Sequence, residues 1–356
     1  MSKNPILPPV RIGIIGAGTM GRQHALFISR EENAELVGVA DPVSGQLAVD
    51  YGVPYFTDQA QLLAMDNLDA VIIASPNAFH VTTALDCIKA GVASLLEKPV
   101  ATSVDEANML AAAMSSGGAP ILVGHHRRHH PAVRAAKGII DSGELGQLVA
   151  VNGMWLTKKS DSYFDQAWRR EKGAGVLLIN LVHDLDLLRH MCGEITSVQA
   201  RTSNNARGYE VEDTASVIFE FENGALGSFI ISDSVVAPWG WDQTTEDDPT
   251  FPLNPTASCY SIAGSKGSLA FPQLGHYYHS GTSDWTQPLS LRYDPRDAGD
   301  SYSSQLKHFI SVARREVEPL VTVEDAAKTL ALIEAVQLAA QEGKIVRIGQ
   351  NRALTH

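Results

Sequence analysis

A glycine-rich segment near the N-terminus has the residue types and the spacing that bind phosphate groups. Gly16, Gly18 and Gly21 form the pattern G-x-G-x-x-G, with Thr19 and Met20 between the last two glycines. The first glycine permits a tight turn, the second lets the backbone approach a pyrophosphate, and the third lets a helix pack closely on a strand. A helix that starts here would also present free N–H groups and a positive dipole to phosphate oxygens. The segment therefore predicts contacts from all five residues to a dinucleotide.

Asp41 stands where dinucleotide-binding folds place an acidic residue. It ends an apolar run, twenty residues after Gly21. A carboxylate at this point can accept hydrogen bonds from the adenosine ribose hydroxyls and would repel a 2′-phosphate. We therefore expect NAD as the cofactor, with NADP as the second choice. The alternative is that the glycines form only a structural turn and that Asp41 caps a strand end.

The segments that must position these residues alternate between two patterns. Apolar residues recur at helical spacing over residues 20–30, 79–90 and 103–115. Short β-branched runs, typical of buried strands, occur at residues 10–15, 35–40, 70–74, 92–96 and 121–123. This alternation predicts an α/β fold with a doubly wound parallel sheet. We assign residues 1–128 to an NAD(P)-binding Rossmann domain.

The pattern changes after residue 128. Hairpin turns such as Asn223-Gly224 join the strand-like runs and predict a large, mostly antiparallel open sheet. Residues 234–257 have little periodicity and predict a long loop, which is often functional. We expect residues 129–356 to form an α+β domain for substrate binding and oligomerisation. Its helices are expected at residues 132–142, 175–191, 304–316 and 323–342, and its strands at residues 147–157, 197–202, 214–222, 225–233, 258–263 and 268–271.

The composition excludes some classes of binding partner and indicates the cellular compartment. The net charge of −12 argues against nucleic acid and anionic membranes as partners. The three cysteines are far apart and form no CxxC pair, which favours buried thiols in a reducing compartment. The first apolar stretch, residues 10–17, is interrupted by Arg11 and glycines, so it predicts neither a signal peptide nor a membrane span. We expect a cytoplasmic protein.

Further motifs, in order along nearly the whole chain, resemble the glucose-fructose oxidoreductase / inositol dehydrogenase (Gfo/Idh/MocA) family. The first is Glu97-Lys98-Pro99, directly after the strand at residues 92–96. The second is Gly173-Ala174-Gly175 followed by residues 180–186, which read NLVHDLD. The others are Ser75-Pro76-Asn77-x-x-His80, Gly124-x-x-Arg127-Arg128-x-x-Pro131 and Trp168-Arg169. The set is specific for the family but not for a substrate.

The resemblance implies a dehydrogenase with two catalytic residues from different domains. His183 matches the family's catalytic histidine, and histidine titrates in the range that suits a base near neutral pH. Lys98 matches the lysine of the EKP motif, whose ammonium can stabilise negative charge on the substrate oxygen. Without the motifs, a core histidine and an exposed strand end would be the simpler interpretations. The resemblance also implies a cis peptide bond between Lys98 and Pro99. It implies cofactor contacts from Ser75, Asn77, His80, Glu97 and Lys98.

One position departs from the family pattern. Many members carry an aspartate four residues before the histidine, where this chain has Ile179. Asn180 follows it, three residues before His183 and on the same helix face. An amide can contact a substrate hydroxyl or orient the histidine, but it cannot act as a base. We therefore expect Asn180 to bind substrate in a site that differs from an inositol site.

Three more side chains are expected to bind substrate: Tyr163, Trp239 in the long loop, and Arg128. For Arg128 a salt-bridged position at the domain junction is an equal alternative, and for Trp239 the alternative is packing at a sheet edge or subunit interface. The histidines at positions 125, 126, 129 and 130 suggest metal binding only superficially. Neighbouring residues of an extended strand point to opposite faces and no familiar ligand spacing accompanies them, so we expect no metal.

Together these observations predict a dehydrogenase that oxidises a secondary hydroxyl of a sugar, sugar derivative or cyclic polyol. The alternatives are an NADPH-dependent reductase of a keto-sugar or imine and a sensor that binds NAD without chemistry. Helices are expected to cover only one side of the second domain's sheet. An apolar sheet face left open is usually an interface, and the family resemblance implies a homodimer or homotetramer.

Overall fold

The computed structural model describes residues 7–114 and 117–349, which form two compact units. The first unit combines the chain up to His126 with Ser301–Leu330. The second combines Arg127–Asp300 with the chain from Ala331 onward. Residues 301–330 thus pack in the first unit, although they lie in the segment that the sequence assigns to the second domain.

The first unit is built on a six-stranded sheet of order β3-β2-β1-β4-β5-β6. All its strand pairs are parallel. The strand order reverses between β1 and β4, and sheets of this kind bind ligands beside the carboxyl ends of the strands at this point. The strands form because runs such as Ala70–Ile73 are apolar and buried on both faces, as a sheet covered on two sides requires. The elements are β1 (Val10–Ile15), α1 (Thr19–Ile28), β2 (Ala34–Ala40), α2 (Gln46–Tyr51), β3 (Tyr55–Phe56), α3 (Gln59–Leu63), β4 (Ala70–Ile73), η1 (Asn77–Phe79), α4 (His80–Ala90), β5 (Ala93–Leu96), α5 (Val104–Met114), β6 (Ile121–Val123) and, from later in the chain, α9 (Ser301–Ala313).

The second unit is built on a nine-stranded sheet of order β14-β13-β12-β11-β7-β10-β9-β8-β15. Its pairs are antiparallel except for β7 with β10. The prediction of a mostly antiparallel sheet is therefore confirmed. Its elements are η2 (His126–His129), α6 (Pro131–Asp141), β7 (Leu148–Leu156), η3 (Asp161–Asp165), η4 (Ala167–Arg170), η5 (Leu177–Leu181), α7 (Val182–Cys192), β8 (Ile195–Ser203), β9 (Thr214–Phe221), β10 (Leu226–Ser232), α8 (Trp241–Thr244), β11 (Tyr260–Gly264), β12 (Gly267–Phe271), β13 (Gly275–Tyr278), β14 (Ser290–Tyr293) and β15 (Val346–Arg347).

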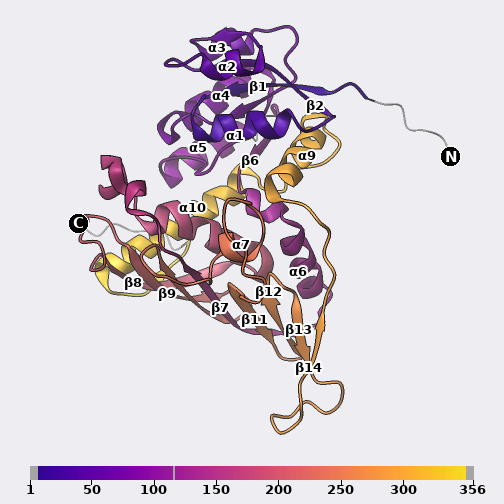
Figure 1. Cartoon of the computed structure of the whole chain (residues 1–356), viewed down its shortest axis with the longest axis vertical. Coiled ribbons are helices and arrows are strands. Elements are labelled where there is room, and N and C mark those ends of the chain that lie inside the picture. Colours follow the sequence, from indigo (N-terminus) through magenta and orange to yellow (C-terminus); the bar gives the residue numbers. More distant parts are fainter. Residues whose placement is uncertain (1–6, 115–116, 350–356) are drawn as a thin grey trace, which may run out of the picture. The chain divides into compact units, whose positions relative to one another are not determined.

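The two faces of this sheet differ in composition. Helices α6 and α7 lie on one face of the sheet (Figure 1). They share a hydrophobic core with inward side chains such as Val217, Phe229 and Ile262. Alternation along β9 and β10 sends Ile218 and Ile230 to the opposite face, where 56% and 40% of their surfaces are exposed. Within the described residues, that face therefore carries exposed apolar side chains.

The last long helix, α10 (Val323–Glu342), has the bounds that the sequence predicts. Its first turns, up to Leu330, belong to the first unit, and the rest belongs to the second. No helix among the described residues is both long enough and apolar enough to cross a membrane.

Two expectations about local structure need correction. The helix expected over residues 175–191 is present, but its first part is the π-helical segment η5, and regular α-helix starts at Val182. Residues 126–129 form a 3-10 turn rather than part of an extended strand, so the argument from alternating strand faces does not apply to the histidines. The start of the π turn is contacted by Glu212, 35 residues further along the chain, and sequence periodicity cannot report such a contact.

Candidate active site

The glycine motif forms a turn whose shape excludes side chains at two of its three glycines. Gly16 has a φ of +101°, and a Cβ on it would lie 2.6 Å from the Ala74 carbonyl group. A Cβ on Gly21 would lie 2.0 Å from the carbonyl oxygen of Gly16. Gly18 has open space around its Cα, as the glycine nearest a bound pyrophosphate requires. Helix α1 starts directly after it at Thr19 and Met20, so its first N–H groups are available to an anion.

Asp41 is held as an anion beside this turn. Its carboxylate accepts hydrogen bonds from the backbone N–H groups of Ala17 (2.8 Å), Val43 (2.8 Å) and Ser44 (3.0 Å). Burial opposes ionisation, but these hydrogen bonds outweigh it and lower the pKa of Asp41. The carboxylate also lines a cavity of 610 Å³, together with Gly16 and Ser75. The cavity is large enough for the adenosine half of a dinucleotide.

The other expected cofactor residues of the first unit lie at the ends of β4 and β5. Asn77 is exposed at the start of η1. His80 is buried, and its two ring nitrogens lie 2.7 Å from the Pro99 carbonyl oxygen and 2.9 Å from that of Ser75. His80 thus links the loop after β4 to the EKP segment. The Lys98–Pro99 bond is cis, which confirms that prediction.

Glu97 is an ion inside the first unit. One of its carboxylate oxygens lies 2.7 Å from His24 Nε2, and the other accepts a hydrogen bond from the backbone of Lys98. Burial opposes ionisation, but the His24 hydrogen bond and the nearby positive charges outweigh it and lower the pKa of Glu97. His24 is not among the site residues that the sequence predicts, although a histidine on the buried face of α1 is a usable signal.

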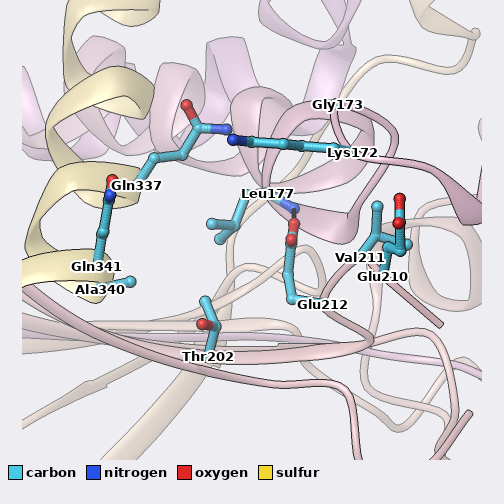
Figure 2. Close-up of a pocket in the computed structure, with 10 residues that line it drawn as sticks. All are labelled: Lys172, Gly173, Leu177, Thr202, Glu210, Val211, Glu212, Gln337, Ala340 and Gln341. Carbon is cyan, nitrogen blue, oxygen red and sulfur yellow. Dashed lines mark hydrogen bonds between the residues drawn. The ribbon is translucent and has the colours of Figure 1, made fainter. Parts of the chain in front are cut away.

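In the second unit, a π turn carries Asn180 and leads directly into His183. His183 lies in the first turn of α7 and is 8% exposed. The start of the π turn is held by Glu212, whose carboxylate accepts the backbone N–H of Leu177 at 3.0 Å (Figure 2). A Cβ at position 175 would lie 2.0 Å from this carboxylate, so Gly175 makes room for the contact. Single π turns are frequent at functional sites.

Figure 2 shows the cavity into which Glu212 faces, with Thr202 of β8 below and residues of α10 at one side. It has a volume of 710 Å³ and lies wholly within the second unit. Burial raises the pKa of Glu212, and the neighbouring carboxylates of Asp233 and Asp213 add to the rise. The lining is Lys172, Gly173, Leu177, Thr202, Glu210, Val211, Glu212, Gln337, Ala340 and Gln341.

Buried ion pairs hold helix α7 beneath His183. Asp184 is completely buried and accepts hydrogen bonds from Arg127 Nη1 at 3.2 Å and from the Tyr260 hydroxyl. Burial raises the pKa of Asp184 to about 6, although both partners favour its ionised form. Arg128 forms a bidentate pair with Asp186, with two N···O distances of 2.7 Å, and is 3% exposed. Arg128 therefore has the salt-bridged environment that the sequence left as an alternative to a substrate contact.

Lys159 forms the centre of a cluster that contains two of the expected substrate-binding residues. Its Nζ donates a hydrogen bond to Asn180 Oδ1 at 2.9 Å and lies 4.6 Å from the centre of the Tyr163 ring. It also lies 3.7 Å from a carboxylate oxygen of Asp233. Its side chain is 14% exposed, and burial lowers its pKa to about 8. Lys159 is not among the site residues that the sequence predicts, because two lysines that follow a strand resemble an ordinary solvated turn.

The remaining candidates are Trp239 and the histidines at positions 125, 126, 129 and 130. Trp239 is 44% exposed, and its backbone oxygen accepts the N–H of Leu156. All four histidines of the run 125–130 are buried; His126 stacks on Tyr302, and His130 caps α6. Among residues 7–114 and 117–349, no three His, Cys, Asp or Glu side chains are grouped as metal ligands. The three cysteines are free and buried.

A Rossmann sheet with this turn and anchored acid, followed by an α+β unit with a histidine and a lysine cluster, defines an NAD-binding oxidoreductase. Two family models match the chain. Residues 10–125 match the model described as "Oxidoreductase family, NAD-binding Rossmann fold", and residues 133–270 match the model described as "GFO/IDH/MocA C-terminal domain". The chain belongs to the GFO/IDH/MocA oxidoreductase family, as the sequence motifs predict.

Relatives and solved structures agree with this assignment. The chain is 28% identical to scyllo-inositol 2-dehydrogenase (NAD(+)) of Bacillus subtilis (strain 168), over 97% of this chain and 98% of that protein. It is 30% identical to inositol 2-dehydrogenase 2 of Saccharopolyspora erythraea, over 92% and 91% of the two chains. The crystal structure of an oxidoreductase from Agrobacterium radiobacter in complex with NAD+, L-tartaric acid and magnesium has the same fold. Its TM-score is 0.80 and its identity 19%, over 96% of this chain and 98% of that one.

Proposed function

We propose that the protein oxidises a secondary hydroxyl of a sugar, sugar derivative or cyclic polyol, with NAD as the hydride acceptor. The observation that carries the proposal is the anchored Asp41 carboxylate beside the glycine turn, combined with His183 at the start of α7. Relatives that act on inositols extend over nearly the whole chain and support the polyol class. Asp41 supports NAD over NADP, because its anionic form would repel a 2′-phosphate.

The proposed roles follow from the chemistry of each group. NAD, when bound, accepts the hydride. The glycine turn and the start of α1 hold the pyrophosphate, and Asp41 holds the adenosine ribose.

His183 takes the hydroxyl proton as general base. Lys98 stabilises negative charge that develops on a substrate oxygen. Asn180 and Tyr163 contact the rest of the substrate. Arg128 supports α7 through its ion pair with Asp186. Trp239 contacts the substrate from the loop that follows β10.

The closest rival is the reverse direction, the reduction of a keto-sugar or imine with NADPH. Hydride transfer is reversible, so the same residues would serve it. The rival from another class is a sensor that binds NAD without chemistry. The sensor hypothesis is weakened because Lys98 and His183, which a sensor would not need, are both present in their family motifs.

A substrate screen tests the proposal. The purified protein is mixed with NAD+ or NADP+ and a panel of cyclitols, aldoses, alditols and sugar acids, and the reduced nicotinamide is followed by absorbance. We expect turnover with at least one member and a preference for NAD+. Binding of NAD+ without turnover on any member, in either direction, would favour the sensor.

We also propose that the protein forms a homo-oligomer through the open face of its nine-stranded sheet. Exposed apolar patches of this kind usually mark interfaces. A monomeric mass in sedimentation at micromolar concentration would contradict the proposal. The exposed apolar side chains of this face are Ile218, Leu226, Ile230, Tyr277, Leu291 and Tyr293.

A further inference from the structure

We infer that Lys159 fixes the amide of Asn180 so that its Nδ2 donors, together with Arg169, form a subsite for a carboxylate group of the sugar substrate. The inference rests on the proposed function and specifies its substrate class as a sugar acid. Asn180 and Tyr163 are its expected substrate contacts, and Lys159 and Arg169 are the cations that flank them.

The orientation of the Asn180 amide follows from hydrogen-bond chemistry. An ammonium group has three donors and no acceptor, so only the Oδ1 side of an amide can face it. The Lys159 Nζ to Asn180 Oδ1 distance of 2.9 Å satisfies this requirement. Nδ2 then points away from the lysine, and it donates no hydrogen bond to any of the described residues, since the Lys159 contact is the one side-chain hydrogen bond of Asn180 among them. A substrate therefore meets two N–H donors at this position, where an aspartate would present an acceptor.

Lys159 itself is firmly placed. Its Nζ lies over the rings of Trp155 and Tyr163, at 5.6 and 4.6 Å from their centres, and its side chain is largely buried. Asp233 lies 3.7 Å away but is shared with Arg207, whose Nε lies 3.1 Å from the same carboxylate. A long side chain with this many contacts holds its partner amide in one orientation.

Arg169 supplies the positive charge that favours an anion. Its guanidinium lies 4.0 Å from the centre of the Tyr163 ring, so it shares that ring with Lys159. Nη1 donates to the backbone oxygen of Tyr163 at 2.7 Å, whereas the buried Nε has no partner in the part of the chain that the structure describes. Within those residues Arg169 also forms no ion pair, unlike Arg127, Arg128 and Arg207. A guanidinium without a carboxylate partner is well suited to receive one from a ligand.

Matched ligand pairs test the subsite by calorimetric titration of the NAD+-saturated protein. The pairs are D-glucuronate with D-glucose, D-galacturonate with D-galactose, and D-gluconate with D-glucitol, in which a carboxylate replaces a hydroxymethyl group. We expect the acid to bind at least about 10-fold more tightly than its neutral partner in one or more pairs, since hydrogen bonds to a charged group are stronger than those to a neutral hydroxyl. Tighter binding of the neutral member, equal binding, or no binding of any acid would overturn the inference.

Variants then test whether Lys159 and Asn180 form the carboxylate subsite or only stabilise the fold. Asn180→Asp replaces donors with an acceptor and should abolish the preference for the acid. Lys159→Met should weaken it, and Lys159→Arg, which keeps a cationic donor, should largely restore it. Lys158→Met removes an exposed lysine one residue away and should change nothing. An unchanged acid preference in Asn180→Asp or Lys159→Met would also overturn the inference.

The pH dependence gives a readout that a purely structural role would not move. The groups that face Lys159 are Asp233, Asp242, Arg207, Tyr163 and Arg169, and burial lowers the pKa of Lys159 to about 8 despite the two carboxylates. Above that pH a neutral amine can also accept a hydrogen bond, so the amide of Asn180 can turn. The acid preference should therefore weaken as the pH rises through about 8 in the native protein and in Lys158→Met, but not in Lys159→Met. A flat profile in the native protein would count against the role of Lys159. If the substrate screen fails while acids still bind preferentially, the proposed function falls and the subsite stands.

Discussion

The two units organise their candidate sites by different physical means. In the first unit, three glycines within six residues and one acid shape a binding turn largely from backbone atoms, and Gly21 must lack a side chain for the turn to exist. In the second unit, the site consists of side chains held by distant side chains. Lys159 reaches Asn180 across 21 positions, and Tyr260 reaches Asp184 across 76. Contacts to an invariant cofactor can be built locally, whereas substrate contacts here depend on tertiary partners.

The largest expected effect separates chemistry from cofactor binding. His183→Ala should lower kcat by about 10³-fold, within the range for loss of a general base, and should leave the Kd for NAD+ nearly unchanged. Lys98→Ala should also lower kcat strongly. Lys89→Ala, an exposed lysine of the first unit, is the matched control. Steady-state kinetics and calorimetry measure both quantities. Near-native turnover in His183→Ala would assign proton abstraction to another group.

Two glycine substitutions separate the role of the first unit's turn in folding from its role in NAD+ binding. In Gly21→Ala the new Cβ meets the Gly16 carbonyl oxygen, which should cost about 1–3 kcal/mol of folding stability and prevent tight NAD+ binding. Gly18→Ala has open space in the free protein, so its Tm should match the native value while the Kd for NAD+ rises about 10- to 100-fold. Native NAD+ affinity in Gly18→Ala would show that the pyrophosphate lies elsewhere.

A smaller effect is expected at the ribose contact. Asp41→Ala should raise the Kd for NAD+ about 10-fold, because hydrogen bonds to a charged acceptor contribute about 1.5–3 kcal/mol. The same change removes the repulsion of a 2′-phosphate, so the NAD+ to NADP+ ratio of kcat/KM should fall. Asp41→Asn keeps one acceptor for the Ala17 N–H and should be intermediate. Equal use of both cofactors by the native enzyme would contradict the assignment.

The smallest effect concerns stability in the second unit. Burial lowers the pKa of Lys159 to about 8 in the folded state, against 10.5 for an ordinary lysine. The unfolded chain therefore binds more protons than the folded chain between pH 8 and pH 10.5. The contribution of this group to the free energy of unfolding rises as the pH increases from 8 to 10.5, and that contribution is lost as the pH falls. Relative to Lys159→Met, the native protein should gain roughly 1–3 kcal/mol over this interval. Denaturant unfolding at several pH values measures it, with Lys158→Met as control. Parallel curves for native protein and Lys159→Met would show that the group titrates normally.

The contrast between the units also explains what the sequence could predict. The glycine turn, Asp41 and most strands of the first sheet depend on residues close together in the chain, and periodicity and motif spacing report such residues directly. Short elements without β-branched residues escaped, such as β3 (Tyr55–Phe56) and β13 (Gly275–Tyr278), whereas β4 and β6 are as short but consist of Ala, Val, Ile and Leu. Lys159, Glu212 and the Arg127–Asp184–Tyr260 contacts escaped because each becomes meaningful only beside a partner far along the chain.

The first unit is also assembled from two separated stretches of chain, which has a consequence for synthesis on the ribosome. Leu306, Phe309 and Ile310 of α9 pack into the hydrophobic core of this unit, and the backbone oxygen of Val321 accepts a hydrogen bond from Val123 of β6. Since these residues are translated after the whole of Arg127–Asp300, the nascent N-terminal segment emerges with part of its core uncovered. We expect it to be retained by chaperones or to aggregate until residues 301–330 leave the exit tunnel.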